Sequence, residues 1–285
     1  YTVCHDTDMD LYVFQSFGNF SKDGNFNTGE YNITRLPDLS SFDGILLDLA
    51  NIPQADLKNE IIEAARSAST PVISLLEKVP GLYFSGIDNY TAIQTVMEHL
   101  ICKHHCRTLN YVSGPAGSVE NQQRFGAYRD ALQKYGIPFD SMRVTGSTYE
   151  IENGIHAFSE FQNRELLPDA FVCANDNIAV GICLAAKKAG YSIPDDFLVT
   201  GFDNENKASF FDPRVTTVGF SKAEIMTNAL ILLSDVWDGS NESMHIYTPV
   251  THVFQESCHC IPVAPADRGQ YVAKNIIDEV RQSDM

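Results

Sequence analysis

The chain has 285 residues, of which 37 are Asp or Glu and 20 are Lys or Arg, so its formal charge is −17. Hydrophobic residues make up 44% and charged residues 20%, which is typical of a globular protein and argues against intrinsic disorder. The excess of acidic residues argues against a nucleic-acid-binding surface on this chain and against contact with anionic membranes. No apolar stretch approaches the roughly 18 residues that a membrane-spanning helix needs.

Apolar segments of strand length alternate with amphipathic segments of helix length along most of the chain. In chain order we expect strand Leu11–Phe17, strand Gly44–Leu49, helix Leu57–Ala68, strand Pro71–Leu76, strand Leu82–Ile87, helix Thr91–Ile101, strand Leu109–Ser113, helix Asn121–Tyr135, helix Glu152–Phe161, strand Ala170–Ala174, helix Asp176–Ala189, strand Phe197–Phe202, helix Lys222–Trp237, strand Tyr247–Gln255 and helix Asp267–Met285. Gly24–Gly29 is expected to be a polar loop. Short apolar strands separated by helices indicate an α/β fold whose parallel sheets are covered on both faces, and the length suits two doubly wound lobes.

Several segments resemble, in order and spacing, the effector-binding domain of LacI/GalR-type transcription regulators, which has the periplasmic-binding-protein type I fold. The matching segments are Tyr111–Gly114, Asn121–Ile137, Phe171–Gly181, Val199–Asn204, Pro213–Val218 and Phe254–Cys260. The resemblance implies two lobes with a ligand cleft between them, linked by crossovers near Phe84–Ile87, Gly219–Ser221 and Thr248–Val250. It assigns residues 1–84 and 222–248 to the N-terminal lobe and residues 85–219 and 249–262 to the C-terminal lobe. Residues 263–285 would form a C-terminal helix or connector.

The chain departs from the family at two places. The family opens with a strand and a helix before the segment that matches Leu11–Phe17, and here only Tyr1–Met9 comes before it. We therefore expect the first strand and helix of lobe 1 to be missing, together with the DNA-binding headpiece. His105 stands where the family usually has a glycine that ends a helix, and a non-glycine residue in that position should cost stability.

Two polar residues follow strands of the second lobe, where open parallel sheets bind ligands. By resemblance, Asn175 and Asp203 fall on sugar-contacting positions, and a carboxylate that accepts hydroxyl hydrogens holds a sugar ring well. Asp176 is expected to cap the following helix instead. Arg124 matches the family's ligand-facing arginine, whose guanidinium can contact two hydroxyls or a carboxylate. The alternative for Arg124 is an exposed residue paired with Glu120.

The acids Asp48 and Glu77 end two strands of the first lobe, and each could either contact the ligand or simply start a loop. Together with Asp88 and Asp203 they outnumber the single Arg124. This balance favours a neutral polyol, an amino sugar or a cation over an anionic ligand.

Three aromatic residues could stack on the C–H face of a sugar, although a core position is the alternative for each. They complete the predicted set of ligand-binding residues: Asp203, Arg124, Asn175, Phe220, Asp48, Glu77, Phe84 and Tyr149. Phe220 is favoured among the aromatics because it lies in a crossover.

Two segments have the spacing of metal ligands, Cys102–Cys106 (CKHHC) and the stretch from His252 to Cys258-His-Cys260. Structural zinc sites usually pair two short knuckles in a loop-rich module, whereas these segments lie at a helix end and on an expected strand. We therefore expect no metal site and no cofactor. No nucleophile with an adjacent base is marked by spacing, so no catalytic residue is assigned and the chain is not expected to be an enzyme.

Seven scattered cysteines suit a reducing cytosol better than a disulfide framework, which predicts a cytoplasmic protein. The resemblance predicts a homodimeric sensor domain of a LacI-type transcriptional regulator or related signalling protein, which binds a small polar ligand, a sugar in particular, and signals by lobe closure. DNA contact would come only from a headpiece outside this chain. Two alternatives stay open: a sensor N-terminal to a signalling enzyme, such as a GGDEF diguanylate cyclase or a histidine kinase, and a transport solute-binding protein.

Overall fold

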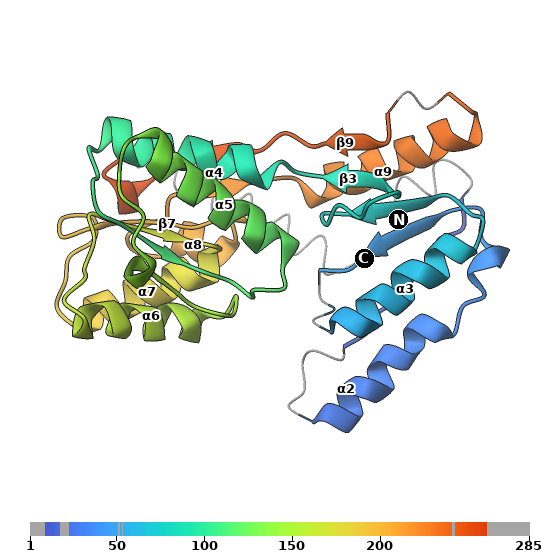
Figure 1. Cartoon of the computed structure of the whole chain (residues 1–285), viewed down its shortest axis with the longest axis horizontal. Coiled ribbons are helices and arrows are strands. Elements are labelled where there is room, and N and C mark those ends of the chain that lie inside the picture. Colours follow the sequence, from blue (N-terminus) through green and yellow to red (C-terminus); the bar gives the residue numbers. More distant parts are fainter. Residues whose placement is uncertain (1–8, 18–22, 51, 53, 241–242, 261–285) are drawn as a thin grey trace.

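The computed structural model describes residues 9–17, 23–50, 52, 54–240 and 243–260, which form two α/β lobes side by side (Figure 1). The elements are, in chain order, α2 (Gly24–Tyr31), η1 (Asn32–Arg35), η2 (Leu39–Ser41), β1 (Ile45–Asp48), α3 (Ala55–Ser67), β2 (Val72–Leu75), β3 (Tyr83–Gly86), α4 (Asn89–Glu98), η3 (His99–Lys103), β4 (Leu109–Val112), α5 (Val119–Lys134), η4 (Ser141–Arg143), β5 (Val144–Thr145), α6 (Ile151–Asn163), β6 (Ala170–Cys173), α7 (Asp176–Lys188), β7 (Leu198–Thr200), α8 (Asn206–Phe210), β8 (Thr217–Gly219), α9 (Lys222–Trp237), β9 (His245–Tyr247), β10 (Thr251–Val253) and η5 (Glu256–Cys258). Within the described residues, no helix combines the length and the apolar character needed to cross a bilayer.

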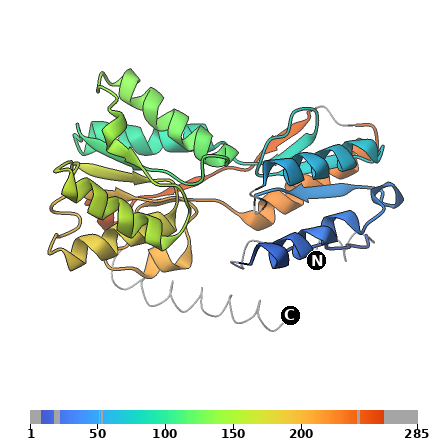
Figure 2. The same ribbon diagram turned by 60° about the horizontal axis from the view of Figure 1, so that its bottom comes forward.

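The first lobe is built on a parallel sheet of order β1-β2-β3-β9, in which Phe84 lies opposite His245. Helices α3 and α9 cover opposite faces of this sheet (Figure 2). Successive residues of a strand point to opposite faces, so neighbouring apolar residues of β2 join different clusters. Val72 packs with Ile62 of α3, whereas Ile73 belongs to the larger core that includes the apolar residues of α9.

The second lobe is built on a parallel sheet of order β5-β4-β6-β7. All four residues of β4 and of β6 are buried, as expected of a parallel sheet with helices on both faces. Helices α4 and α5 cover one face, and α6 and α7 cover the other (Figures 1 and 2). The predicted α/β fold with two parallel sheets is confirmed.

The chain passes between the lobes three times, from β3 to α4, from β8 to α9 and from β9 to β10. Strand β9 pairs with β3 in the first sheet, whereas β10 pairs antiparallel with β8, with Thr251 opposite Gly219. The predicted domain boundary between residues 84 and 85 falls inside β3, because Phe84 and Ser85 both pair with β2 and with β9 in the first sheet.

The predicted strand Leu11–Phe17 is wrong. This segment has no regular secondary structure and is mostly exposed, although the rings of Tyr12 and Phe14 contact the ring of Phe42 edge-on at 5.7 and 6.2 Å. An apolar segment becomes a strand only where a neighbouring strand accepts its backbone hydrogen bonds, and no described strand lies beside this one.

Two other predictions need correction. Gly24–Gly29 belongs to helix α2 rather than to a loop, because the Asp23 carboxylate accepts a hydrogen bond from the N–H of Asn25 at 2.9 Å and caps the helix. The predicted strand Tyr247–Gln255 is divided into β9 and β10, with Pro249 between them. The other predicted strands and helices that fall on described residues lie within a few residues of observed elements, whereas β5, α8 and β8 were not predicted. The predicted helix Asp267–Met285 lies outside the described residues.

Candidate ligand-binding site

Polar side chains of the second lobe gather in the loops that follow β4, β6 and β7, at the carboxyl ends of neighbouring parallel strands. The loop after β4 is closed by Asn121, whose Oδ1 accepts a hydrogen bond from the N–H of Gly114 at 2.9 Å. Ser118 caps α5, because its hydroxyl accepts from the N–H of Asn121 at 3.2 Å. These contacts fix the start of α5 and hence the direction of Arg124, which lies in its second turn.

Arg124 is the buried cation of the cluster, only 2% exposed. Its Nε donates to Oδ1 of Asn89 at 2.8 Å, and its Nη1 donates to the carbonyl oxygen of Ala174 at 2.7 Å. The guanidinium carbon lies 3.7 Å from the centroid of the Phe202 ring. The alternative of an exposed arginine paired with Glu120 is therefore wrong, and the guanidinium is held rigidly from several sides.

Asp203 is the acidic partner of Arg124, with its Oδ1 3.6 Å from Nη2 of the arginine and its side chain 24% exposed. The backbone has φ +101°, a costly conformation for a residue with a side chain, and its N–H donates to the carbonyl of Val218 at 2.8 Å. Burial raises the pKa of Asp203 to about 6, while the charge of Arg124 acts to lower it. The carboxylate thus stays reachable from solvent with the guanidinium fixed beside it.

Asn175 is the cap of α7, with an extended backbone (φ −151°, ψ 178°) and an Oδ1 that accepts from the N–H of Ile178 at 3.0 Å. Its Nδ2 donates to the carbonyl of Tyr149 at 3.2 Å. The prediction that Asp176 caps this helix is wrong by one residue. The side-chain oxygen and nitrogen of Asn175 therefore both hold the local structure in place.

Asp176 is a buried carboxyl group beneath the cluster. Its Oδ1 accepts from the hydroxyl of Thr217 and its Oδ2 from the N–H of Glu205, each at 2.7 Å. Burial raises the pKa of Asp176 to about 8, although both hydrogen bonds act in the opposite direction. Asp176 thereby links the start of α7 to the loop that carries Asp203.

Two of the three predicted aromatic residues lie at this cluster. The hydroxyl of Tyr149 is 2.9 Å from Oγ of Ser118, and the half-buried ring of Phe220 lies 6.4 Å from that of Phe202. Phe84 is 2% exposed within the first lobe, the core position that the sequence left open as the alternative.

The first-lobe acids Asp48 and Glu77 lie at or just beyond the carboxyl ends of β1 and β2, and β1 points toward the second lobe (Figure 1). Asp48 is exposed and accepts from the N–H of Ala50 at 3.0 Å, as a residue that starts a loop would. Glu77 forms a half-buried ion pair with Lys58 at 2.8 Å. Within the part of the chain that the structure describes, neither carboxylate pairs with Arg124.

Two surface hollows lie apart from the cluster. One of about 460 Å³ lies between η2 and α3, and is lined by Pro37 and Glu60 among others. One of about 190 Å³ lies at the passages between the lobes, where it is lined by Asp88 and His252 among others. Neither is lined by Arg124 or Asp203, and Asp203 is the more exposed member of this pair.

Sequence reasoning missed the residues that hold Arg124. Asn89 lies in the first turn of α4, and nothing in its spacing marks it as a partner of α5. Phe202, which supports the guanidinium, belongs to the segment Val199–Asn204 that carried the resemblance. Its position directly before Asp203 could therefore have marked Phe202 as a residue of the site.

Two parallel-sheet lobes joined by three passages, with a polar cluster at the carboxyl ends of the strands, define the class of bilobal α/β ligand-binding domains. A family model described as "Periplasmic binding protein-like domain" matches residues 97–258, more than half of the chain. The chain belongs to this family.

Known proteins support this placement. The HTH-type transcriptional repressor PurR of Mannheimia succiniciproducens is 33% identical over 136 residues, 48% of this chain and 40% of the relative. The HTH-type transcriptional repressor CytR of Escherichia coli K12 is 28% identical over 208 residues, 73% of this chain and 55% of the relative. The chain thus spans about half the length of the curated relatives it matches.

Solved structures share the fold. The transcription regulator CcpA of Lactococcus lactis matches with a TM-score of 0.73 at 19% identity, over 90% of each chain. A complex of the transcriptional regulator CelR with cellobiose matches with a TM-score of 0.65 at 22% identity, over 75% of this chain and 65% of that one. At these identities the likeness concerns the fold alone.

Proposed function

We propose that this chain binds a small neutral carbohydrate at the Arg124–Asp203 pair and acts as the sensor of a transcriptional regulator. One observation carries the proposal. Asp203 is held in a costly backbone conformation that keeps its carboxylate partly exposed beside a buried, fully supported arginine. Backbone strain of this kind persists at functional sites because the surrounding structure enforces it.

The chemistry of the pair favours hydroxyl groups as partners. A guanidinium cannot accept a hydrogen bond, and two nitrogens of Arg124 already donate to Asn89 and Ala174, so the acceptor capacity of the pair lies on Asp203. A carboxylate accepts hydrogen bonds from ligand hydroxyls and repels an anion. Tyr149 and Phe220 supply aromatic surface nearby, which suits the C–H face of a sugar ring.

The relatives support the same class of ligand and the same role. One structure that shares this fold is titled as a cellobiose complex, and we extend that ligand class to this chain. The curated relatives are named as transcriptional repressors, not as enzymes, which supports a regulatory and non-catalytic role in the cytoplasm. DNA contact by a segment outside this chain, and pairing of two copies, are part of the proposal.

The test is a thermal-shift and calorimetric panel of neutral mono- and disaccharides, sugar phosphates, nucleosides and amino acids. A ligand at 100 times its Kd stabilises the folded chain by about 2.7 kcal/mol, which raises Tm by several degrees. We expect a neutral sugar to give this shift and its phosphorylated form to give less.

Asp203→Asn keeps the size of the side chain and removes its charge, so it should abolish the shift. The matched control is Asp238→Asn, an exposed acid at the end of α9, which should leave the shift unchanged. A shift caused only by anionic compounds, or one that Asp203→Asn leaves intact, would overturn the proposal.

A further inference from the structure

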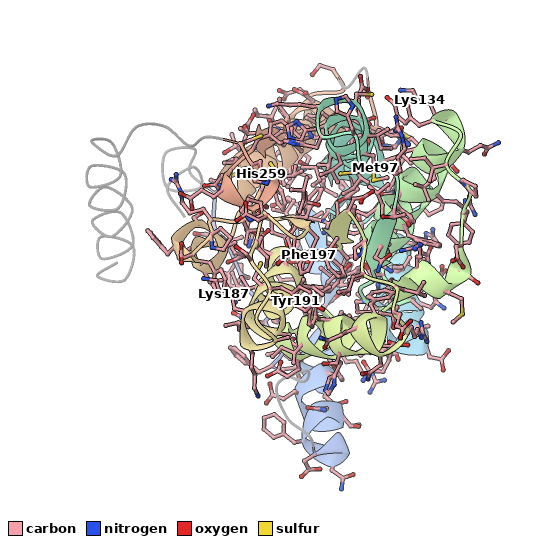
Figure 3. All side chains as sticks on the ribbon, turned by 90° about the vertical axis from the view of Figure 1, so that its left-hand side faces the viewer. Met97, Lys134, Lys187, Tyr191, Phe197 and His259 are labelled. Carbon is pink, nitrogen blue, oxygen red and sulfur yellow. The ribbon has the colours of Figure 1, made fainter. Side chains whose placement is uncertain are left out.

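Four potential metal ligands converge in the second lobe, near the end of helix α4. They are the ring nitrogens of His99 and His104 and the sulfurs of Cys258 and Cys260, and all four ligand atoms lie within 4.8 Å of one another. His99 and Cys258 are 159 residues apart in the sequence. Figure 3 looks onto this end of the molecule, where His259 lies beside the helix that carries Met97.

The spacing of the four atoms fits a tetrahedral metal ion. Bond lengths typical of zinc imply that two nitrogens lie about 3.3 Å apart and a nitrogen and a sulfur about 3.6 Å apart. Nε2 of His99 is 3.0 Å from Nε2 of His104, 3.6 Å from Sγ of Cys258 and 3.4 Å from Sγ of Cys260. Nε2 of His104 is 3.6 Å from Sγ of Cys260.

Local backbone geometry aims each pair of ligands at the same point. Residues five apart in an α-helix point about 140° away from each other. His99–Lys103 is instead a π-helix, in which the N–H of His104 donates to the carbonyl of His99 at 3.3 Å, so the two imidazoles lie side by side. Between the two cysteines, His259 has a left-handed backbone with φ +58°, which turns Cys260 back toward Cys258.

The surroundings of the sulfurs are those of thiolate ligands. The hydroxyl of Thr216 lies 2.8 Å from Sγ of Cys258, and Nζ of Lys103 lies 3.4 Å from Sγ of Cys260. Hydrogen-bond donors of this kind hold and tune metal-bound thiolates. The ring of His99 stacks on that of Phe254 at 3.6 Å, which fixes its orientation.

We propose that His99, His104, Cys258 and Cys260 form a Cys₂His₂ site for one tetrahedral divalent ion, with Zn²⁺ as the ion that this donor set prefers. Four protein ligands leave no position open for a substrate, so the site is structural. Its effect is to tie the end of α4 to the segment that follows β10. The cysteines are buried and the histidines half-buried, which leaves the ion a route from solvent.

The expectation of no metal site rested on treating two segments separately. The fold brings them together, and it takes three of the four ligands, His104, Cys258 and Cys260, from the two marked segments. Cys102 is exposed and His105 is not part of the cluster, whereas His99 lies before the first marked segment and supplies a ligand. The sequence offered no signal for His99, because a π-helix cannot be told from an α-helix by its residue pattern.

The test is Co²⁺ and Zn²⁺ binding by the full chain, purified and kept under a non-thiol reductant. We expect one Co²⁺ per chain, with the visible absorption of a tetrahedral centre and the near-ultraviolet band of thiolate-to-cobalt charge transfer, both removed by one equivalent of Zn²⁺. His104→Gln and Cys260→Ser should weaken binding by more than about 100-fold, the upper end of the loss caused by removing an outer-shell partner.

The matched controls are Cys102→Ser and His105→Gly, which change a cysteine and a histidine of the same segment that are not ligands. Both should bind Co²⁺ as the unchanged chain does. A reduced chain that unfolds cooperatively yet gives no cobalt spectrum would overturn the proposal, and this result does not depend on any variant folding. Equal binding by the ligand variants, or a Cys258–Cys260 disulfide in the chain purified with Zn²⁺, would overturn it as well.

Discussion

Asp176 is the residue whose environment should dominate the dependence of stability on pH. Its pKa is raised from 3.8 to about 8 by burial, so the folded chain keeps this proton over a range in which the unfolded chain has lost it. The free energy of unfolding should therefore fall as pH rises from about 4 to about 8, by at most about 1.4 kcal/mol per pH unit for this one group. Urea unfolding at several pH values measures this slope.

The matched variants for this prediction are Asp176→Asn and Asp203→Asn. The amide introduced by Asp176→Asn can accept from the N–H of Glu205 and donate to the hydroxyl of Thr217, so that variant should fold and should lose the slope between pH 6 and 8. Asp203 has a pKa of about 6, so its variant should change only the acid part of the curve. Stability that rises between pH 6 and 8 in the unchanged chain would contradict this account.

Single residues also show how far sequence reasoning reaches. Asp203 and Arg124 were placed from the resemblance, and the structure brings them together. The cap of α7 is Asn175 rather than Asp176, because a helix start can be predicted only to within a residue or two and the cap depends on which residue has the extended backbone. His105, which stands where the family usually has a glycine that ends a helix, has a left-handed backbone with φ +57°.

At the scale of elements, α6 and α7 pack so closely that two glycines are required. A methyl group on Gly154 would overlap the carbonyl oxygen of Ile178, and one on Gly181 would overlap that of Ile151. These contacts are with backbone atoms, which cannot rotate away. Gly154→Ala and Gly181→Ala should each lower the free energy of unfolding by about 2 kcal/mol or more, as measured by denaturant unfolding.

Gly126 is the control for these substitutions. It lies in α5, and a methyl group there would meet no atom within 4 Å. Gly126→Ala should therefore raise stability by about 0.5–1 kcal/mol, because alanine restricts the unfolded chain and favours the helix. If all three variants had the same effect, the close approach of α6 and α7 would not be the cause.

The elements that sequence reasoning found are marked by their own apolar residues, whereas the features it got wrong depend on contacts with other parts of the chain. A strand such as β6, fully buried between covered neighbours, is marked by its own apolar residues. Leu11–Phe17 has the same local pattern, but a strand also needs a partner, and the pattern of one segment does not contain that information. The π-helix at His99–Lys103 and the division of Tyr247–Gln255 depend likewise on contacts with distant parts of the chain.

At the scale of the whole molecule, the passages after β3, β8 and β9 are the only covalent links between the lobes within the described residues, and they are suited to act as hinges. If a ligand bound at Asp203 is also contacted by the first lobe, binding should bring the lobes together. Small-angle X-ray scattering should then show a smaller radius of gyration with the sugar, and no change for Asp203→Asn. A sugar that raises Tm without making the chain more compact would contradict closure.

The division of each lobe between distant parts of the chain has a consequence for its synthesis. The sheet of the second lobe has all its strands once Thr200 has left the ribosome, whereas the first sheet must wait for β9 at His245–Tyr247. Domains often fold in the order in which they are made. Here the sheet whose strands begin first should be completed last, so its early strands remain exposed to chaperones and proteases after the four-stranded sheet of the second lobe is complete.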